Sequence, residues 1–211
     1  MQKYFIKTPW IVKKMFPNYI WNMPANNNAV YLTFDDGPHP RITSWVLDEL
    51  KKYNAKASFF CIGKNVVKHP DIYYRIISEG HTVGNHTYNH LNGWKVSDEK
   101  YIHDINEAAR YISTNLFRPP YGRIRANQFH RLNKAMQKES KIIMWDVLSA
   151  DFNAAISPEQ CLKNVISNTV PGSIIVFHDS EKAYTNLVHT LPAVMQLLNE
   201  KKCLLKKIEF N

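Results

Sequence analysis

Two adjacent carboxylates follow the first apolar run that has the length of a strand. Asp35 and Asp36 stand after Phe34 and before the turn residues Gly37 and Pro38. The period of a regular strand would send the two carboxylates to opposite faces, but a Gly-Pro turn can make them converge. Carboxylates that close repel each other, and a metal on one with an arginine near the other would keep both ionised. In isolation the same residues are also a common turn sequence.

A pair of histidines, His86 and His90, is spaced four residues apart. This spacing would place both on one face of a helical turn, within reach of one ion. Joined with Asp36, the pair gives two imidazoles and one carboxylate. That ligand set suits Zn²⁺, Co²⁺, Ni²⁺ or Fe²⁺ and leaves positions open for water and substrate, as a catalytic site requires. Taken alone, the histidines could also be surface or capping residues.

A rigid loop at residues 118–122 has the sequence Arg-Pro-Pro-Tyr-Gly. The two prolines restrict the backbone, so the loop fixes one guanidinium and one run of main chain where the chain cannot flex. Such rigidity suits the wall of a catalytic site.

A further histidine, His178, ends an apolar run of strand length. The period of two places Val176 and His178 on one face and Asp179 on the other. Asp179 therefore cannot easily orient His178. A carboxylate from another strand end, Asp146 or Asp151, is the better candidate.

These groups need elements that bring them to one place. Apolar runs of strand length alternate with segments of helical period, which favours βα units and a mostly parallel sheet in one domain. The expected strands are residues 29–34, 57–62, 81–84, 142–147, 173–178 and a closing strand near 204–210. The expected helices are 42–53, 71–78, one capped by Ser97 that runs to about 113, 157–168 and 186–200. Since ligands collect at the carboxyl ends of strands in α/β folds, the candidate residues are expected at that edge.

The composition is that of an ordinary globular chain. Its 211 residues are 45% hydrophobic and 21% charged, which excludes disordered and collagen-like classes and allows a real core. Cys61, Cys161 and Cys203 form no CxxC pair, so neither a disulfide framework nor a thiolate zinc site is indicated. The net charge of +9 suits an anionic polymer or surface. The basic residues are spread along the chain without a nucleic-acid motif, so no nucleic acid partner is expected.

Residues 1–28 are expected to form an N-terminal strap packed on a domain of residues 29–211. Pro9 and Pro17 interrupt the strap, and a membrane-surface helix is the alternative for it. No apolar run exceeds four residues, whereas a spanning helix needs about 20 and a signal-peptide core about 7 to 15. We therefore expect no transmembrane helix and no signal peptide, and the oligomeric state stays open.

Five short motifs in this order resemble those of the polysaccharide deacetylases of carbohydrate esterase family 4, the NodB-like domain. They are TFDDGP at 33–38, HTYNH at 86–90, RPPY at 118–121, DF at 151–152 and VFH at 176–178. The resemblance runs from about residue 29 to the C-terminus. It implies an α/β fold, a distorted (β/α) barrel with mostly parallel strands. It also implies a metal-dependent hydrolase that removes N-acetyl groups from N-acetylhexosamine units of a polysaccharide, peptidoglycan or chitin-like.

The resemblance assigns a metal to one group of residues. Asp36, His86 and His90 would bind a divalent transition metal, with Zn²⁺ first and Co²⁺, Ni²⁺ or Fe²⁺ as alternatives. Asp35 would be the general base that takes a proton from a metal-bound water, and Arg118 would orient Asp35.

The resemblance gives the remaining roles to other residues. His178 would protonate the leaving amine, Asp151 would hold the other nitrogen of His178, and the backbone N–H of Tyr121 would face the developing oxyanion. The substrate pocket would be lined by residues of the third, fourth and fifth motifs, namely Pro119, Pro120, Phe152 and Val176.

Two of the motifs depart from the family pattern. Phe152 stands where the family has tryptophan, and Val176 where it has leucine, so the pocket for the acetyl methyl keeps its apolar character but changes shape. Two alternatives stay open: an O-acetyl esterase acting on a glycan such as xylan, and a non-catalytic carbohydrate-binding protein. Substrates of this kind lie mainly in the cell envelope. Without a visible signal peptide, the chain is expected in the cytoplasm, exported by another route, or held at the membrane through residues 1–28.

Overall fold

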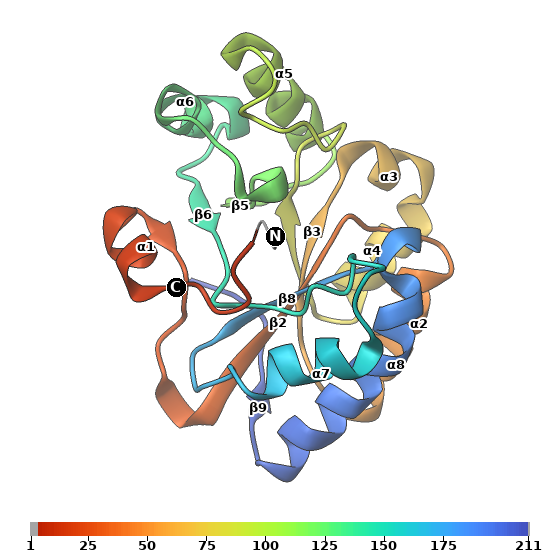
Figure 1. The fold of residues 1–211 in the computed structure, drawn as a ribbon. Coiled ribbons are helices and arrows are strands. Elements are labelled where there is room, and N and C mark those ends of the chain that lie inside the picture. The colour runs from red at the N-terminus through yellow and green to blue at the C-terminus, as the bar shows by residue number, and fades with distance from the viewer. Residues whose placement is uncertain (1–3, 211) are drawn as a thin grey trace.

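A computed structural model describes residues 4–210, so residues 1–3 of the expected strap and residue 211 lie outside it. Within the described chain one sheet holds nine strands, and every pair of neighbouring strands is parallel. Eight of them follow the order β1 (Tyr19–Ile20), β6 (Lys141–Ile143), β5 (Leu116–Phe117), β4 (Thr82–Asn85), β3 (Ser58–Cys61), β2 (Ala29–Asp35), β8 (Ile174–His178), β7 (Val147–Leu148). The ninth, β9 (Leu204–Leu205), pairs with the start of β2. The sheet curls around a common centre, which confirms the predicted distorted barrel (Figure 1).

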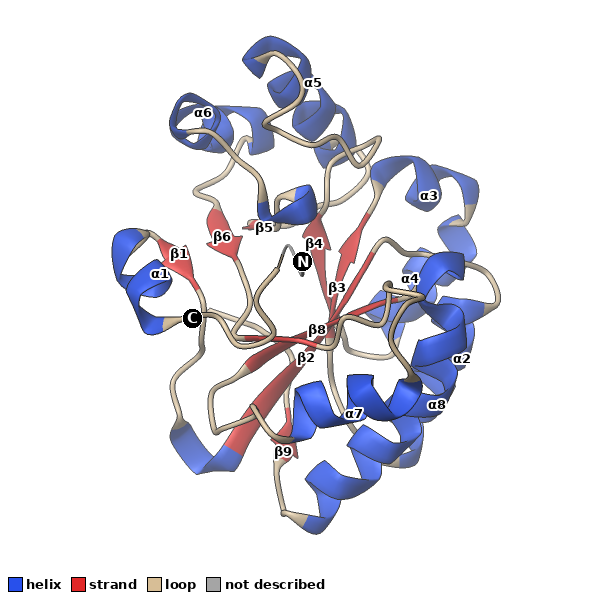
Figure 2. Cartoon of the chain, in the orientation of Figure 1, coloured by secondary structure: helices blue, strands red, loops and turns tan. Residues whose placement is uncertain are grey.

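The helices lie outside the curled sheet (Figure 2). They are α1 (Trp10–Met15), α2 (Ile42–Lys52), α3 (Gly63–Lys68), α4 (Pro70–Ser78), α5 (Asp98–Ala109), α6 (Ala126–Met136), α7 (Pro158–Ile166) and α8 (Glu181–Glu200), with short 3₁₀ turns at Asn26–Asn28 and Pro120–Gly122. Ser97 caps α5 as expected, because its side chain accepts a hydrogen bond from the backbone N–H of Lys100. No helix among residues 4–210 is long and apolar enough to cross a membrane.

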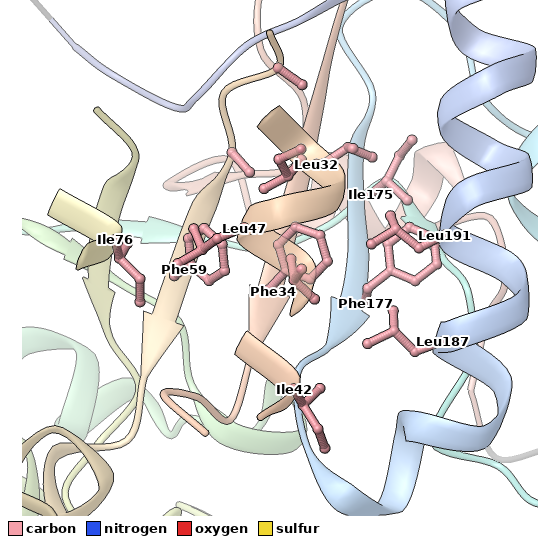
Figure 3. Packing of buried hydrophobic residues seen from close by; sticks show 14 of the residues in the cluster. Leu32, Phe34, Ile42, Leu47, Phe59, Ile76, Ile175, Phe177, Leu187 and Leu191 are labelled. Carbon is pink, nitrogen blue, oxygen red and sulfur yellow. The ribbon is translucent and has the colours of Figure 1, made fainter. Parts of the chain in front are cut away.

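The outward faces of the central strands make the main core (Figure 3). Leu32 and Phe34 of β2 and Phe177 of β8 are fully buried against α2 and α8, where they meet Leu47 and Leu191. Burying each such side chain contributes about 1.5 to 3 kcal/mol. Because side chains alternate along a strand, the residues between these core positions face the inside of the barrel. The core therefore fixes which polar side chains point into the barrel.

The N-terminal segment closes the barrel between its two edge strands. Its strand β1 pairs with β6, while Lys7 forms an antiparallel bridge with Val147 of β7. A second antiparallel bridge joins Asn22 to Ser173 at the start of β8. The helix α1 lies between Lys7 and β1 in the sequence, and its residues Trp10 and Met15 are exposed. Membrane contact of this segment, like the division at residue 28, stays a prediction.

The largest difference from the sequence-based expectation concerns residues 142–147. The single strand expected there is wrong: β6 ends at Ile143, and β7 begins at Val147 on the other edge of the sheet. In between, the backbone N–H of Met144 donates to Ile20 O and that of Asp146 to Ile174 O. The apolar run at residues 142–145 carries no alternation that could show the chain leaving one edge and joining the other.

Smaller differences concern helices and ends. The short helix α3 and the helix α6, which is rich in polar residues, were not expected, and α8 begins at Glu181, five residues before the expected start at 186. The closing strand is limited to Leu204–Leu205. These differences leave the strand order, and with it the location of the site, unchanged.

Candidate active site

The two adjacent carboxylates line one pocket of about 740 Å³. Strand β2 ends at Asp35, and Asp36 adopts a positive φ of 85°, which turns the chain so that both side chains face the same space. The turn is held from outside, since Asn65 Nδ2 donates to Asp36 O at 2.8 Å. Asp179 accepts a hydrogen bond from the backbone N–H of Gly37 at 3.0 Å. A Cβ at Gly37 would lie 2.1 Å from Asp179 Oδ2, so only glycine fits there.

Arg118 lies fully buried inside the barrel and is paired with Asp35. Its Nη1 donates to Asp35 Oδ1 at 2.7 Å and to Thr33 Oγ1 at 2.7 Å. Nε and Nη2 donate to the carbonyls of Ile143 and Met144. With these donors used, the guanidinium cannot rotate, and a fixed positive charge adjoins Asp35.

The histidine motif forms a loop, and the expected helical turn is wrong. The loop that follows β4 includes Thr87 and His90, both with positive φ. Asp104 of α5 holds this loop from behind, because its carboxylate accepts hydrogen bonds from the backbone N–H groups of Tyr88 and Asn89 at 3.0 and 2.9 Å. The loop conformation, rather than a helical face, brings the two imidazoles together, with ring centroids 5.1 Å apart.

Asp36, His86 and His90 are brought to one point. Each offers one ligand atom, and these atoms all lie within 4.8 Å of one another. His86 Nδ1 lies 2.7 Å from the carbonyl oxygen of Arg118, an acceptor only, so Nδ1 carries the proton and Nε2 presents its lone pair. Burial lowers the pKa of His86, and it lowers the pKa of His90 to about 4, so both imidazoles are neutral near pH 7.

The same cluster contains an unpaired acceptor. Among the described residues, Asp36 Oδ1 is buried without a hydrogen-bond donor in good geometry, although His90 Nε2 lies 3.2 Å away. Burial disfavours the Asp36 carboxylate, but the charge of His178, joined by His90 and His86 once these are protonated at low pH, brings the pKa of Asp36 below the ordinary value. A buried carboxylate oxygen without a donor beside two imidazole lone pairs fits a transition-metal ion.

His178 is held on the opposite wall by Asp151. Asp151 Oδ1 accepts from His178 Nδ1 at 2.8 Å, and Oδ2 accepts from the backbone N–H of His178 at 2.8 Å. Burial by itself would lower the pKa of His178, but the charge of Asp151 and its hydrogen bond raise it to about 9. Of the two carboxylates left open by the sequence, Asp151 is the one in contact, while Asp146 binds Lys7 and Lys13 elsewhere.

The pocket has an apolar wall next to His178. Val176 and Phe152 line it, and the Phe152 ring stands edge-on to His178 with centroids 5.0 Å apart. Pro119 lines the pocket, whereas Pro120 is buried in the turn and lies outside the lining. At the opposite rim, Tyr121 is exposed, has a φ of 59° and packs against His90 at 4.7 Å between centroids.

Several residues of the site carry no motif that would mark them in the sequence. Tyr4, Trp145 and Leu148 line the pocket, and Asp104 positions the histidine loop. Asn186 of α8 donates to the carbonyl of Asp151 at 3.1 Å. All five act through tertiary contacts. The only available signal was a polar residue within a helix, as at positions 104 and 186, which is too common to be specific.

Comparison with known proteins finds relatives of this chain in sequence and in structure. The sequence profile of the polysaccharide deacetylase family matches residues 22–139. A peptidoglycan-N-acetylglucosamine deacetylase of Bacillus cereus is 40% identical over 169 residues, covering 77% of this chain and 60% of that protein. A second one from the same organism is 33% identical, covering 86% of each chain. The crystal structure of the Bc1960 peptidoglycan N-acetylglucosamine deacetylase superposes with a TM-score of 0.82 at 34% identity, covering 94% of each chain.

Proposed function

The chain belongs to the polysaccharide deacetylase family, and we propose that it hydrolyses the N-acetyl group of N-acetylglucosamine units in a polysaccharide, with peptidoglycan as the first substrate to test. One observation carries this proposal. Two proton-transfer groups, each fixed by its own buried partner, line the same pocket as three converging metal-ligating residues. Sugar binding alone requires no such arrangement.

Asp35 is the proposed general base. Its carboxylate lines the pocket, and the salt bridge to buried Arg118 at 2.7 Å keeps it oriented with one oxygen engaged and the other free. It would take a proton from the attacking water as that water adds to the acetyl carbonyl. Arg118 acts through Asp35, since four of its five N–H donors are used on protein acceptors.

Asp36, His86 and His90 would hold a divalent transition metal, with Zn²⁺ first and Co²⁺, Ni²⁺ or Fe²⁺ as alternatives. Such an ion would supply Lewis acidity toward the acetyl carbonyl and the water. What the chain itself supplies is the neutral state of both imidazoles, the Nε2 lone pair of His86 and the ionised state of Asp36. The positive φ angles of Asp36 and His90 set the direction in which their side chains leave the backbone.

His178 is the proposed general acid. Its pKa of about 9 means that the imidazole is protonated at neutral pH, before the leaving group needs a proton. Asp151 engages Nδ1, so Nε2–H is left to donate to the departing amine nitrogen as the C–N bond breaks. The proton taken by Asp35 and the proton given by His178 are then exchanged with solvent.

Acetate release tests this function. Purified protein would be incubated with peptidoglycan, N-acetylglucosamine oligomers and acetylated xylan, each with and without a chelator, beside an Asp35→Asn variant as the control. We expect release from the N-acetylated glycans, loss of release with chelator and recovery on adding Zn²⁺. Release from xylan alone would support the O-acetyl esterase alternative, and binding without any release would support the non-catalytic one.

A further inference from the structure

The N-terminal segment contributes a side chain to the pocket. Tyr4 is one of the lining residues, and its ring packs edge-on against Phe152 with centroids 5.4 Å apart. Asn153 Nδ2 donates to the Tyr4 hydroxyl at 2.7 Å. In Figure 1 the first described part of the chain, at the red start of the ribbon, runs through the middle of the ring of strands, in agreement with these contacts. A residue of the N-terminal segment therefore lines the site, beside Phe152.

The segment behind Tyr4 is anchored firmly. Leu148 N–H donates to Ile6 O at 2.8 Å, and Thr8 N–H donates to Asp146 O at 2.9 Å, which ties the segment to β7 on both sides of Lys7. Lys7 Nζ donates to the fully buried Asp146 carboxylate at 2.6 Å. An anchor three residues from Tyr4 limits how far its ring can move.

Tyr4 lies on the apolar side of the pocket. Leu148, Phe152, Val176 and Trp145 line the same pocket, and Phe152 separates the Tyr4 ring from His178. The polar groups of the pocket include the two carboxylates, the two clustered histidines and Lys182, whose Nζ lies 5.3 Å from the centroid of the Phe152 ring. The methyl group is the apolar end of the acetyl group, so we expect it to pack against this apolar side of the pocket.

From these contacts we propose that Tyr4 bounds the acyl end of the pocket and sets the size of acyl group that the enzyme accepts. This inference rests on the proposed function, because it assigns the apolar wall to the acyl group. Removing the ring takes away the support on the outer side of Phe152 and leaves apolar space that a longer acyl chain can fill. The hydroxyl serves a different purpose, since it accepts a hydrogen bond from Asn153.

The test uses 4-nitrophenyl acetate, propionate and butyrate, which report on the acyl side of the pocket without a glycan. We would measure kcat/KM for the wild type, Tyr4→Ala, Tyr4→Phe and Phe5→Ala, with metal content and melting temperature for each. Phe5 is the matched control, because it neighbours Tyr4 but is exposed and absent from the pocket lining. Each methylene buried in the new space favours the longer ester several-fold. We expect Tyr4→Ala to raise the butyrate-to-acetate ratio by about tenfold.

The other variants separate the ring from its surroundings. Tyr4→Phe keeps the ring and should keep the ratio within about twofold, and Phe5→Ala should leave it unchanged. An unchanged ratio in an active Tyr4→Ala protein, or an equal loss on all three esters, would overturn the inference and leave the proposed function standing. A wild-type protein that carries its metal and hydrolyses none of the esters would overturn the inference, and a lack of acetate release from N-acetylated glycans as well would overturn the proposed function.

Discussion

Two carboxylates, buried Asp146 and half-buried Asp36, are surrounded in opposite ways. The Asp146 side chain is 0% exposed, and both of its oxygens are engaged: Lys13 donates to Oδ1 at 2.5 Å, while Lys7 and Ser173 donate to Oδ2 at 2.6 Å each. The Asp36 side chain is 22% exposed and has an oxygen without a donor in good geometry, beside two neutral imidazoles.

The difference separates a structural ion pair from a binding site. A carboxylate whose acceptors are all filled by the chain has nothing left for a ligand, so its contribution is to stability. A cluster whose acceptors and lone pairs lack partners within the chain lowers the stability of the folded state. Such clusters are characteristic of functional sites. Substitutions in the two clusters should therefore affect different quantities, activity in one case and stability in the other.

The largest expected effect comes from the Asp36 cluster. In the His86→Ala, His90→Ala double variant we expect loss of the bound divalent ion and a fall in kcat/KM of at least about 10³-fold, since the Lewis acidity of an ion contributes several kcal/mol. Elemental analysis and acetate release measure both. Full metal content in the double variant would remove these residues from the ligand set.

The second prediction concerns Asp35→Asn, which should lower activity without loss of the metal. Asparagine keeps the size of the side chain but cannot accept the proton, so we expect kcat lower by about 10² to 10⁴ with the metal retained. Asp35→Asn also leaves the buried Arg118 guanidinium without its counter-ion, so the melting temperature should fall as well, although Thr33 and two carbonyls still engage Arg118. If Asp35→Asn instead lost the metal and kept its rate after reloading, Asp35 and Asp36 would have exchanged roles.

A third substitution addresses the general acid. His178→Ala should lose about 10² or more on an N-acetylated sugar, because a departing amine needs a proton, but much less on an aryl acetate, whose phenolate leaves with little help. Asp151→Asn should show a weaker form of the same pattern, and metal content should be unchanged in both. Equal losses on amide and aryl ester, measured as kcat/KM, would assign His178 another role.

The sequence predicted the strand ends and the residues that meet there, because these depend on local pattern. The period of two in the run ending at His178 placed it opposite Asp179, and in the structure Asp179 binds Gly37 on the far side while His178 faces the pocket. The strand period could not choose between Asp146 and Asp151, and only the family resemblance pointed to Asp151, since the choice depends on which strand edge each residue reaches. That edge is set by the break between β6 and β7.

Other features depend on contacts between distant segments. Nothing near Tyr4 in the sequence shows that the N-terminal segment runs along β7 and ends beside Phe152. The loop at His86–His90 was expected as a helical turn because spacing alone cannot distinguish a helix from a loop held by Asp104. Tertiary hydrogen bonds decided both conformations.

On the structural side of the comparison, Asp146→Asn should lower the free energy of unfolding by about 2 kcal/mol. Breaking a buried pair costs about 3 to 5 kcal/mol, but Lys7 and Lys13 are 36% and 23% exposed and can turn toward water, which reduces the loss. Urea denaturation measures it. At 25 °C the folded variant should keep its bound metal. Loss of the metal from the folded variant would contradict the separation of the two clusters.

A change in the pH dependence of stability extends the comparison to a histidine. His81 is buried, and its Nδ1 is already engaged by the backbone N–H of Ala57 at 3.1 Å. Burial lowers the pKa of His81 to about 4, while an unfolded histidine titrates near 6.5. As the pH falls from about 6.5 to 4, the unfolded chain binds a proton that the folded chain excludes.

This one proton lowers the free energy of unfolding by about 1.4 kcal/mol per pH unit across that window. His178 acts in the opposite direction: its raised pKa of about 9 gives stability that is complete below about 6.5 and is lost as the pH rises to 9. His81→Gln keeps an acceptor for the Ala57 N–H but cannot titrate. Denaturation of the chelator-treated protein between pH 4.5 and 9 should therefore show a shallower acid limb in His81→Gln, by about one proton, and an unaltered alkaline limb. Equal acid slopes in the two proteins would mean that His81 is not kept neutral by burial.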